Sequence, residues 1–600
     1  MRKLFRWSQI SVSLQQAKTL SLDWLDALKL NWYLAPLSFV LTMSRNIIVG
    51  LIPAANAWLL RTVLLMVVAH ASFLLLLLLT SGLVATSLLQ SLEMQHLDGY
   101  SQRKSSLFVI RKLLIVLRSW PAIRFEEEER VTRLTRIRRD STCPSAIATA
   151  TGKLLGATTV FISFLGILWH ISPSIALLGT IIGVPVIGVA AHVSALEFSV
   201  EEKQAKRQRF ADYLASIISV PRLAKETKVF QSGTFLLKEW YELSSVLIRE
   251  ALSASFRVTI LEVLTLTAGL AIFSWFLFQL IGLVETRQLS SALFIALIPF
   301  AISLLQTMDE ARLATKSLIK GLYSWNRCKE VLATESREGQ QAVRQQGELR
   351  EGALHVQLQS VSFRYPGETG WCLEDITLEV FPGETLALVG VNGSGKTTLA
   401  QLIAGIYEPE CGSVTYNNIA LQQVSHAERA RRIAFVFQSP IKYPASTLEN
   451  ISSLRSLESE TLSQLYDRIQ ILQLSPTIHH LKLSMGYSDG TDISGGQWQK
   501  IALARALVDT RASLFLLDEP TASLDPETEV EVFRLFRRLT QGSTRIIISH
   551  RLGFAREADR IAVLDHGKLR EVGSHQQLIE RNDLYAQMYA AQSAWYAGKG

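Results

Sequence analysis

Six long apolar stretches constrain this chain most strongly, because a water-soluble domain rarely contains even one. Each comes close to the roughly 20 mostly apolar residues that an α-helix needs to cross a bilayer. The stretches are residues 32–66, 72–95, 144–169, 173–198, 256–282 and 289–312. Of the 600 residues, 48% are hydrophobic and only 19% are charged, whereas soluble proteins carry about 25% charged residues. We therefore predict a multi-pass membrane domain with six helical spans in residues 31–325.

The loops between these stretches alternate in length and charge. Residues 67–71, 170–172 and 283–288 are short loops whose single basic residue is Arg287, whereas the long loops 96–143 and 199–255 are rich in Lys and Arg. Basic loops stay in the cytoplasm, so the long loops and the C-terminal part are predicted to be cytoplasmic. Loops that face an anionic membrane then explain the net charge of +8. We expect membrane lipid as a partner and no nucleic acid.

The regions on either side of the membrane part differ from it in composition. Residues 1–30 mix basic, aromatic and polar residues and have no unbroken apolar core of a signal peptide, which predicts an amphipathic helix on the cytoplasmic membrane surface. Residues 326–352 are polar and predict a linker. In residues 353–600, short apolar strands alternate with helices, as in an α/β domain. Four cysteines form no CxxC pair and are expected to be free thiols: Cys143, Cys328, Cys372 and Cys411.

The α/β part contains the phosphate-binding loop Gly390-Val391-Asn392-Gly393-Ser394-Gly395-Lys396-Thr397. It follows apolar residues 385–389 and precedes a helical run, which is the strand–loop–helix context that this motif needs. Glycines let backbone N–H groups surround phosphate oxygens at the start of the helix. We expect Lys396 to reach the β- and γ-phosphates of ATP and Thr397 to hold Mg²⁺. The other candidate nucleotide-binding residues here are Gly390, Asn392, Gly393, Ser394, Gly395 and Thr398.

Residues 514–519 form a second motif, an apolar strand that ends in the carboxylates Asp518 and Glu519. We expect Asp518 to support Mg²⁺ through a coordinated water. Glu519 is the candidate general base that polarises the attacking water. Two acids can end a strand by chance, but their occurrence together with a phosphate-binding loop favours nucleotide hydrolysis.

The pentapeptide at 493–497, Ile-Ser-Gly-Gly-Gln, resembles the LSGGQ signature of ABC ATPases, with Ile493 in place of the usual leucine. The resemblance covers residues 354–590. It implies a P-loop α/β ABC ATPase fold, ATP and Mg²⁺ as cofactors, and ATP hydrolysis as the activity. It also adds signature residues to the nucleotide-binding candidates: Ser494, Gly495, Gly496 and Gln497.

The same resemblance assigns roles to four single residues. Tyr365 resembles the aromatic residue that stacks on adenine. Gln438 resembles the Q-loop residue that contacts Mg²⁺ and the membrane domain. Asp525 resembles the D-loop aspartate, and His550 the switch histidine that contacts the γ-phosphate. The catalytic candidates are then Glu519, His550 and Gln438, and the metal-binding candidates are Thr397, Gln438 and Asp518.

Six spans followed by one ATPase domain in one chain resemble one half of an ABC exporter. In that family, ATP lies between the phosphate-binding loop of one ATPase domain and the signature of another, so two chains must meet. The complete motif set favours a homodimer with two equal sites, and a partner chain with degenerate motifs is the alternative. Residues 121–129 and 225–230 are expected to be coupling helices that rest in the ATPase domains near the Q-loop.

Within the exporters, the ATPase part is most similar to bacteriocin exporters, notably the lantibiotic exporters of the nisin type. The similarity rests on residues 494–505, where Trp498 follows the signature glutamine and drug exporters mostly carry arginine or lysine. It implies export of a ribosomally made, modified peptide across the cytoplasmic (inner) membrane of a bacterium. The first cysteine is Cys143, so we expect no N-terminal cysteine peptidase, and peptide-modifying enzymes are candidate partners.

Two other interpretations of the function stay open. A lipid or multidrug exporter has the same architecture and the same ATPase chemistry. A relative that does not pump is disfavoured because Glu519, Gln438 and His550 are all present. Polar residues inside predicted spans are costly and point to function, and here they are Arg45, Asn46, Arg61 and Glu262. Glu262 has two interpretations, contact with a cationic cargo or pairing with an arginine.

Overall fold

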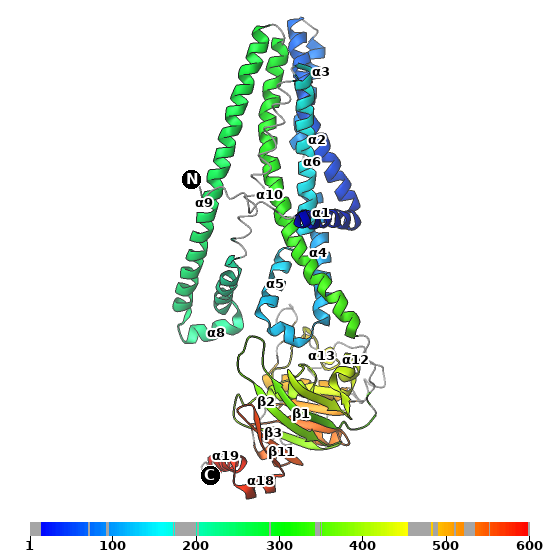
Figure 1. The fold of residues 1–600 in the computed structure, drawn as a ribbon, viewed down its shortest axis with the longest axis vertical. Helices are drawn as coiled ribbons and strands as arrows, with labels where there is room; N and C mark the ends of the chain where they lie inside the picture. The colour runs from blue at the N-terminus through cyan, green and yellow to red at the C-terminus, as the bar shows by residue number, and fades with distance from the viewer. Residues whose placement is uncertain are drawn as a thin grey trace. The chain divides into compact units, whose positions relative to one another are not determined.

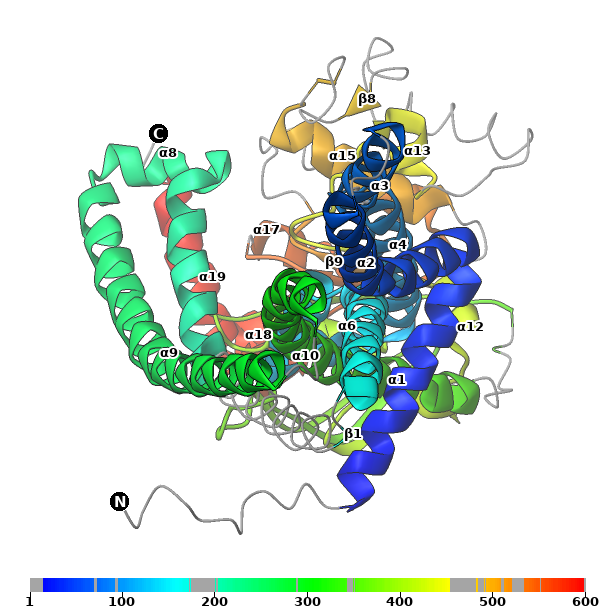
Figure 2. The same cartoon turned by 90° about the horizontal axis from the view of Figure 1, so that it is seen from above.

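The computed structural model describes residues 14–69, 73–91, 95–171, 173, 200, 203–286, 290–342, 349, 351–453, 482–483, 490–491, 493–508, 512–520, 534–550 and 552–597. The chain divides into two compact units. The first contains Met1–Ser119 and Glu129–Ser336, and the second contains Trp120–Glu128 and Arg337–Gly600. The helices of the first unit and the sheets of the second are drawn in Figures 1 and 2.

The first unit consists of long helices. They are α1 (Leu14–Leu34), α2 (Pro36–Val68), α3 (Phe73–Ser91), α4 (Gln95–Ser119), α5 (Glu128–Arg139), α6 (Cys143–Ile171), α8 (Pro221–Val229), α9 (Gly233–Glu285) and α10 (Ser291–Ala342), together with a helix at residues 203–219. Among the described helices, α2, α6 and the Ser291–Val331 part of α10 are each long and apolar enough to cross a membrane. The second and fifth predicted spans fall within or near α3 and α9. The fourth, 173–198, lies outside the described residues except for residue 173.

Helices α2 and α6 approach closely because small residues face each other. A Cβ atom on Gly50 would lie 2.6 Å from the carbonyl oxygen of Gly156, and one on Gly156 would lie 2.8 Å from the carbonyl oxygen of Asn46. Only glycine allows this approach, which is how helices pack where no water drives them together. Asn46 donates to the Thr42 carbonyl at 2.7 Å, so this polar residue of the first span is used within the helix contact.

Helix α1 is held to its neighbours by its polar face. Asn31 is 1% exposed, and its amide donates to the carbonyl oxygens of Ala27 and Pro144 at 3.0 and 2.6 Å. Its side-chain oxygen accepts from the hydroxyls of Ser101 and Ser105 on α4 at 3.1 and 3.3 Å. One amide therefore joins α1, α4 and the start of α6, with every hydrogen-bonding position used.

Other contacts of α1 reach α10. Lys329 donates to Asp23 at 2.8 Å and to Asp26 at 2.6 Å. Leu22 and Tyr33, by contrast, are exposed. Helix α10 continues to Ala342, so the first part of the predicted linker 326–352 is helical. Trp325 and Cys328 are buried beside Cys143 in one cluster of this unit.

The end of α9 packs against α6 and α10 in a separate apolar cluster. Leu280 of α9 is buried there with Phe300 of α10 and Phe164 of α6, and the two phenylalanine rings meet edge to face at 5.3 Å. Toward α8, α9 diverges from α10 (Figures 1 and 2). The backbone of Glu262 lies in α9, but its side chain is outside what the structure describes.

The second unit contains two main sheets. An antiparallel sheet has the order β2-β1-β4-β5, and a mainly parallel sheet has the order β12-β11-β3-β10-β9-β6. Strands β3, β9 and β10 are buried along their whole length, as expected for parallel strands covered on both faces. The strands are β1 (Val356–Phe363), β2 (Leu373–Val380), β3 (Thr385–Val389), β4 (Cys411–Tyr416), β5 (Ile419–Ala420), β6 (Ile433–Val436), β7 (Ala445–Ser446), β8 (Lys482–Leu483), β9 (Leu514–Asp518), β10 (Thr544–Ile548), β11 (Arg560–Asp565) and β12 (Lys568–Gly573).

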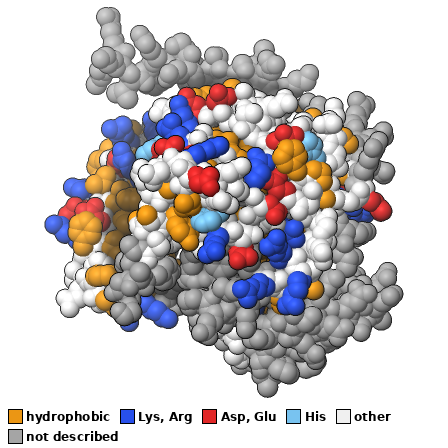
Figure 3. All heavy atoms as spheres, turned by 90° about the horizontal axis from the view of Figure 1, so that it is seen from below, with side chains coloured by type: hydrophobic (Ala, Val, Ile, Leu, Met, Phe, Trp, Pro, Cys, Tyr) orange, Lys and Arg blue, Asp and Glu red, His pale blue; other side chains and the backbone are white. Residues whose placement is uncertain are grey.

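Short helices surround these sheets. They are η2 (Ala122–Glu126), α11 (Lys396–Ile403), η3 (Leu421–Gln423), α12 (His426–Arg432), α13 (Thr447–Ile451), α15 (Gly495–Val508), α17 (Leu552–Ala555), α18 (His575–Arg581) and α19 (Leu584–Ala597). The face shown in Figure 3 carries acidic and basic side chains interspersed with apolar ones. A mixed surface of this kind suits contact with water.

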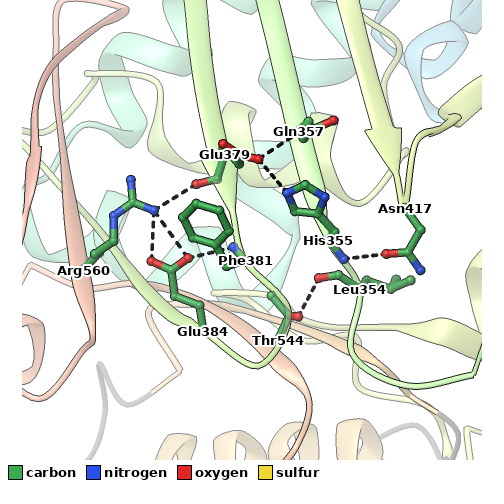
Figure 4. Close-up of polar contacts among 9 residues, drawn as sticks. All are labelled: Leu354, His355, Gln357, Glu379, Phe381, Glu384, Asn417, Thr544 and Arg560. Atoms are coloured by element: carbon green, nitrogen blue, oxygen red, sulfur yellow. Dashed lines mark hydrogen bonds and ion pairs between the residues drawn. The ribbon is translucent and has the colours of Figure 1, made fainter.

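A polar network joins the two sheets (Figure 4). The Thr544 hydroxyl donates to the Leu354 carbonyl at 2.6 Å. Arg560 of β11 donates to the Glu379 carbonyl of β2 and to the Glu384 carboxylate, both at 3.2 Å. Its guanidinium also lies 5.5 Å from the ring of Phe381. These bonds hold the two sheets together around the apolar core that they share, which helps to set the position of β3 and the loop that follows it.

We predict that Asn31→Ala destabilises the helical unit. The change leaves the fully buried Ser105 hydroxyl without its acceptor and costs about 1–3 kcal/mol. Thermal unfolding of the full chain in lipid nanodiscs measures the loss. Tyr33→Ala, at an exposed position of the same helix, is the control and should change the melting temperature little. Equal shifts for both variants would show that the Asn31 contacts do not hold α1 in place.

Candidate functional site

Four of the predicted motifs lie at the carboxyl ends of adjacent parallel strands. β3, β10, β9 and β6 are neighbours in this order, and all pair in parallel. The phosphate-binding loop follows β3, His550 follows β10, Asp518 ends β9, and Gln438 follows β6. Ile548 of β10 is level with Asp518 on one side and Leu388 on the other. Ligands of open α/β sheets bind at this edge.

The phosphate-binding loop has a backbone that only glycine permits at two positions. Gly390 has a φ of 151°, and a Cβ atom there would lie 2.1 Å from the Leu564 carbonyl oxygen. Gly395, at φ 95°, caps the start of α11, and a Cβ there would lie 2.6 Å from the Leu373 side chain. The loop also contains Asn392 and Gly393, which are exposed, and Ser394, which is buried.

Lys396 occupies the inside of this loop. It is 5% exposed, and its ammonium donates to the carbonyl oxygens of Gly390 and Val391 at 3.0 and 2.8 Å. Burial lowers the pKa of Lys396, and the nearby carboxylates of Glu519 and Asp518 partly oppose that shift. An anionic phosphate beside this ammonium would compensate the cost of its burial, so the loop is prepared for a nucleotide.

Asp518 and Thr397 form a pair of oxygen ligands next to the loop. Asp518 is 3% exposed. Burial raises the pKa of Asp518, and the hydrogen bond from the Thr397 hydroxyl is the main effect that opposes this. A carboxylate beside a hydroxyl suits a hard cation such as Mg²⁺, which takes one or two carboxylates together with phosphate oxygens and waters. The residues predicted for the metal therefore fit it in chemical type.

Glu519 is held by the two other catalytic candidates. The amide of Gln438 donates to one carboxylate oxygen of Glu519 at 2.8 Å, and the imidazole of His550 contacts the other oxygen. Glu519 has a φ of 46°, and its N–H donates to the Ile548 carbonyl at 3.1 Å. A positive φ in a non-glycine residue is costly and is typical of functional sites. The structure thus brings the three predicted catalytic residues together.

Tyr365 is fixed in place by its hydroxyl and its ring. The hydroxyl lies 3.0 Å from that of Thr398, which also accepts from the Cys372 thiol at 3.4 Å. Burial raises the pKa of Tyr365. Its ring meets Phe363 and Tyr407 edge to face, at 5.1 and 5.7 Å. Thr398, a predicted nucleotide-binding residue, thus directs its hydroxyl to Tyr365 and Cys372.

The signature motif forms the start of α15. Ser494 accepts from the Gln497 N–H at 3.3 Å, and the Ser494 N–H donates to the Gln497 side chain at 3.1 Å. This reciprocal pair is a capping box, and it leaves Gly495 and Gly496 in the first turn of the helix. Asp525 lies outside the described residues.

Sequence reasoning missed several residues that support the site. Asn450 and Arg505 connect α13 to α15, and Tyr407 contacts Glu126, 281 positions away. Nothing in the local sequence signals these contacts. Trp498 did stand out in the sequence, and the structure shows Lys442 over its ring.

We predict that Asp518→Asn stabilises the nucleotide-free protein. Because its pKa is raised, the ionised carboxylate is less favourable in the folded protein than in water. This penalty is absent below the pKa of the unfolded group and complete above the raised folded pKa. At neutral pH the variant should melt up to about 4 °C higher, with ATP hydrolysis lost. Thermal melts at acidic and neutral pH should show a gain that grows with pH.

The control for this variant is Asp565→Asn, at a half-buried acid that ends strand β11 of the same sheet. It should show no such gain. A lower melting temperature for Asp518→Asn at neutral pH would contradict the prediction.

Comparison with known proteins identifies the two parts of the chain. The family model for ABC transporters matches residues 373–522. The subtilin transport ATP-binding protein of Bacillus subtilis is 28% identical over 77% of this chain and 76% of its own length, and the nisin transport ATP-binding protein of Lactococcus lactis is 28% identical over 84% and 85%. The ATP-dependent lipid A-core flippase of Alkalilimnicola ehrlichii is 36% identical over 40% of each chain.

A solved structure of a bacterial Atm1-family ABC exporter with ATP bound has the same fold. The TM-score is 0.69 at 17% identity, over 94% of this chain and 98% of that one. The predicted fold class, apolar helices followed by an α/β ABC ATPase domain, is confirmed. The chain thus joins the ATPase domain of an ABC transporter to a membrane domain with the ABC exporter fold, and it is an ATP-hydrolysing transporter.

Proposed function

We propose that two copies of this chain form an exporter that uses ATP to move a ribosomally made, modified peptide out of a bacterial cell. The observation that carries the peptide assignment is how far each similarity extends. The lipid A-core flippase matches 240 residues, about the length of an ATPase domain alone. The nisin and subtilin transport proteins match 535 and 480 residues, which must include much of the membrane domain.

Coverage matters because the two domains do different work. The ATPase chemistry is common to exporters of every cargo, so similarity there says little about what is moved. The cargo passes through the membrane domain, so a relative that also matches there is better evidence for a shared cargo class than one that matches the ATPase domain alone. This argument favours peptide over lipid.

The proposed homodimer is supported by the motif set and is compatible with the exposed apolar surface of α9. The chain carries one phosphate-binding loop and one signature, while an ATP site of this family needs one from each of two domains. Among the described residues of α9, Val263, Leu264, Leu270 and Phe278 expose their apolar side chains. An exposed apolar face on so long a helix suits lipid or a second copy of the chain.

In the proposed reaction, Glu519 accepts a proton from the attacking water. Gln438 and His550 each contact one oxygen of its carboxylate, so the base has a defined orientation. Lys396 and the N–H groups of the loop would hold the phosphates. Thr397, Asp518 and Gln438 would hold Mg²⁺, which would neutralise negative charge on the phosphates.

The segment Trp120–Glu128 offers a route from the ATP site to the membrane helices. It belongs to the same compact unit as the ATPase domain, and it continues directly into α4 and α5. Ala122 and Ile123 pack against the ATPase core. Tyr407 donates to the Glu126 carboxylate at 3.1 Å, and burial, with Glu126 nearby, raises the pKa of Tyr407. Because Tyr407 also touches the Tyr365 ring, adenine binding can reach this segment.

The first test is ATP hydrolysis by the purified chain in lipid nanodiscs. One arm receives a leader-bearing modified peptide, and the other receives lipid or lipophilic dyes. We expect saturable stimulation by the peptide alone. Glu519→Gln keeps the shape of the side chain and removes the base, so it should lower kcat by about 10²–10⁴-fold while ATP still binds.

The possible outcomes separate the proposals. Stimulation by lipid or dyes alone would replace the peptide assignment with a lipid or drug exporter. No hydrolysis by a folded wild-type dimer would contradict the homodimer and point to a partner chain.

We also predict that Tyr407→Phe uncouples hydrolysis from cargo. The variant loses the hydroxyl that binds Glu126 but keeps the ring that supports Tyr365. Basal hydrolysis should stay within about twofold, while stimulation by cargo should fall about three- to tenfold, the effect of losing about 1 kcal/mol.

The matched control is Tyr416→Phe, which removes another buried tyrosine hydroxyl of the same domain. Tyr416 donates to the Ile403 carbonyl, and among the described residues its hydroxyl has no hydrogen bond to residues 120–128. If both variants lose stimulation equally, the effect is one of stability and not of coupling.

A further inference from the structure

Two cation–π contacts join the segment after Gln438 to α15. In one the segment provides the cation, and in the other the helix does. The Lys442 ammonium lies 5.2 Å from the centre of the Trp498 ring. The Arg505 guanidinium lies 4.9 Å from the centre of the Tyr443 ring. The segment thus contributes one cation and one ring, and the helix contributes one ring and one cation.

The spacing of these residues makes the contacts a single unit. Lys442 and Tyr443 are adjacent, and Trp498 and Arg505 are seven residues apart on α15. Seven residues are about two helical turns, so both side chains lie on one face. We call this unit the cation–π clamp, consisting of Lys442, Tyr443, Trp498 and Arg505.

Asn450 of α13 fixes the same arrangement with hydrogen bonds. Arg505 donates to the backbone and side-chain oxygens of Asn450 at 2.7 and 2.8 Å. Asn450 in turn donates to the Tyr443 carbonyl at 3.0 Å and accepts from the Tyr443 N–H at 3.2 Å. Asn450 is fully buried, and α13 contacts α15 (Figure 2). The clamp is therefore attached to a buried, hydrogen-bonded part of the domain.

The two residues of the Lys442–Trp498 contact differ in burial. Trp498 is 3% exposed and belongs to the core cluster beneath α15. Lys442 is exposed. The Trp498 ring is thus fixed in the core, while the Lys442 ammonium lies over it from the segment after Gln438. That segment can therefore separate from α15 without opening the core.

We propose that the cation–π clamp positions Gln438 from the signature helix. Gln438 lies four residues before Lys442, and α15 begins at the signature glycines. The clamp keeps the Gln438 segment and the signature in a fixed position relative to each other. Gln438 then contacts Glu519 only when α15 is in place. The inference rests on the proposed function, in which the signature completes the ATP site of the second copy. Each chain would thereby link Gln438 in one site to the signature in the other.

This role also explains why a tryptophan follows the signature glutamine. Indole offers the strongest cation–π surface of the aromatic side chains. An arginine at this position would place a second cation beside Lys442 and would repel it. Trp498 and Lys442 are then positioning residues, since neither is predicted to touch ATP.

The test uses the full chain in nanodiscs with Lys442→Met, which keeps the aliphatic stem and removes the charge. We expect kcat to fall about three- to tenfold, the Mg²⁺ concentration for half-activation to rise by a similar factor, and KM for ATP to stay within about twofold. Lys442→Arg keeps the cation and should behave like wild type. Trp498→Phe keeps an apolar ring with weaker cation binding and should fall between them.

The matched control is Lys568→Met, at a lysine of the same domain that pairs with Glu374 instead of a ring. Unchanged kcat in Lys442→Met, or an equal change in Lys568→Met, would overturn the inference. So would a drop in kcat with a matching drop in melting temperature, which would show a structural role only.

Gln438→Ala separates this inference from the proposed function. If Gln438→Ala leaves the Mg²⁺ concentration for half-activation unchanged, the predicted metal role of Gln438 is wrong. The clamp inference is then tested by the change in kcat alone. If Gln438→Ala raises the requirement and Lys442→Met does not, the clamp inference fails while the proposed function stands.

Discussion

Parallel pairing of β3, β10, β9 and β6 is the constraint on which the rest of the ATP site depends. Residues that act together are far apart in the chain: Gln438 and Glu519 are 81 positions apart and still share a 2.8 Å hydrogen bond. They meet because each follows a strand whose carboxyl end reaches the same edge. A slip of one residue in any pair would turn alternate side chains to the opposite face and separate the carboxylates from the phosphate-binding loop. The network around Arg560 and Glu384 therefore matters to function, because it holds β11 of this sheet to β2, although none of its residues is predicted to bind the nucleotide.

The ATP site contains several energetically unfavourable features of the fold. Burial disfavours the charged forms of both Lys396 and Asp518, and Glu519 has a positive φ. These costs are local, and they are offset by the apolar cores on either side of the parallel sheet. A nucleotide with its cation supplies the opposite charges to the first two residues. The site is thus suited to a nucleotide with its cation, and binding and stability are linked at the same residues.

The sequence predicted the local parts of this arrangement because their physical causes are local. Glycines with positive φ define the phosphate-binding loop, and apolar strands that end in acids define Asp518 and Glu519. The contacts that connect these parts were not predictable, since Tyr407 and Glu126 are brought together only by tertiary packing. The same holds for α1: its amphipathic sequence indicated a helix, but not that Asn31 would be buried against α4 and α6. Likewise, the polar composition of residues 326–352 predicted a linker, while the structure continues α10 to Ala342.

Polar residues in the spans illustrate how packing limits the search for a cargo site. Asn46 is a polar residue in an apolar helix, which by itself suggests a place for cargo. In the structure its amide is bonded within α2 and its backbone touches Gly156. Thr42 and Ser38 on the same helix bond to Asp98 and to the Leu97 carbonyl of α4. These groups are already used in holding helices together. In the proposed dimer, side chains that the described helices leave exposed are therefore better candidates for cargo contact than Ser38, Thr42 and Asn46.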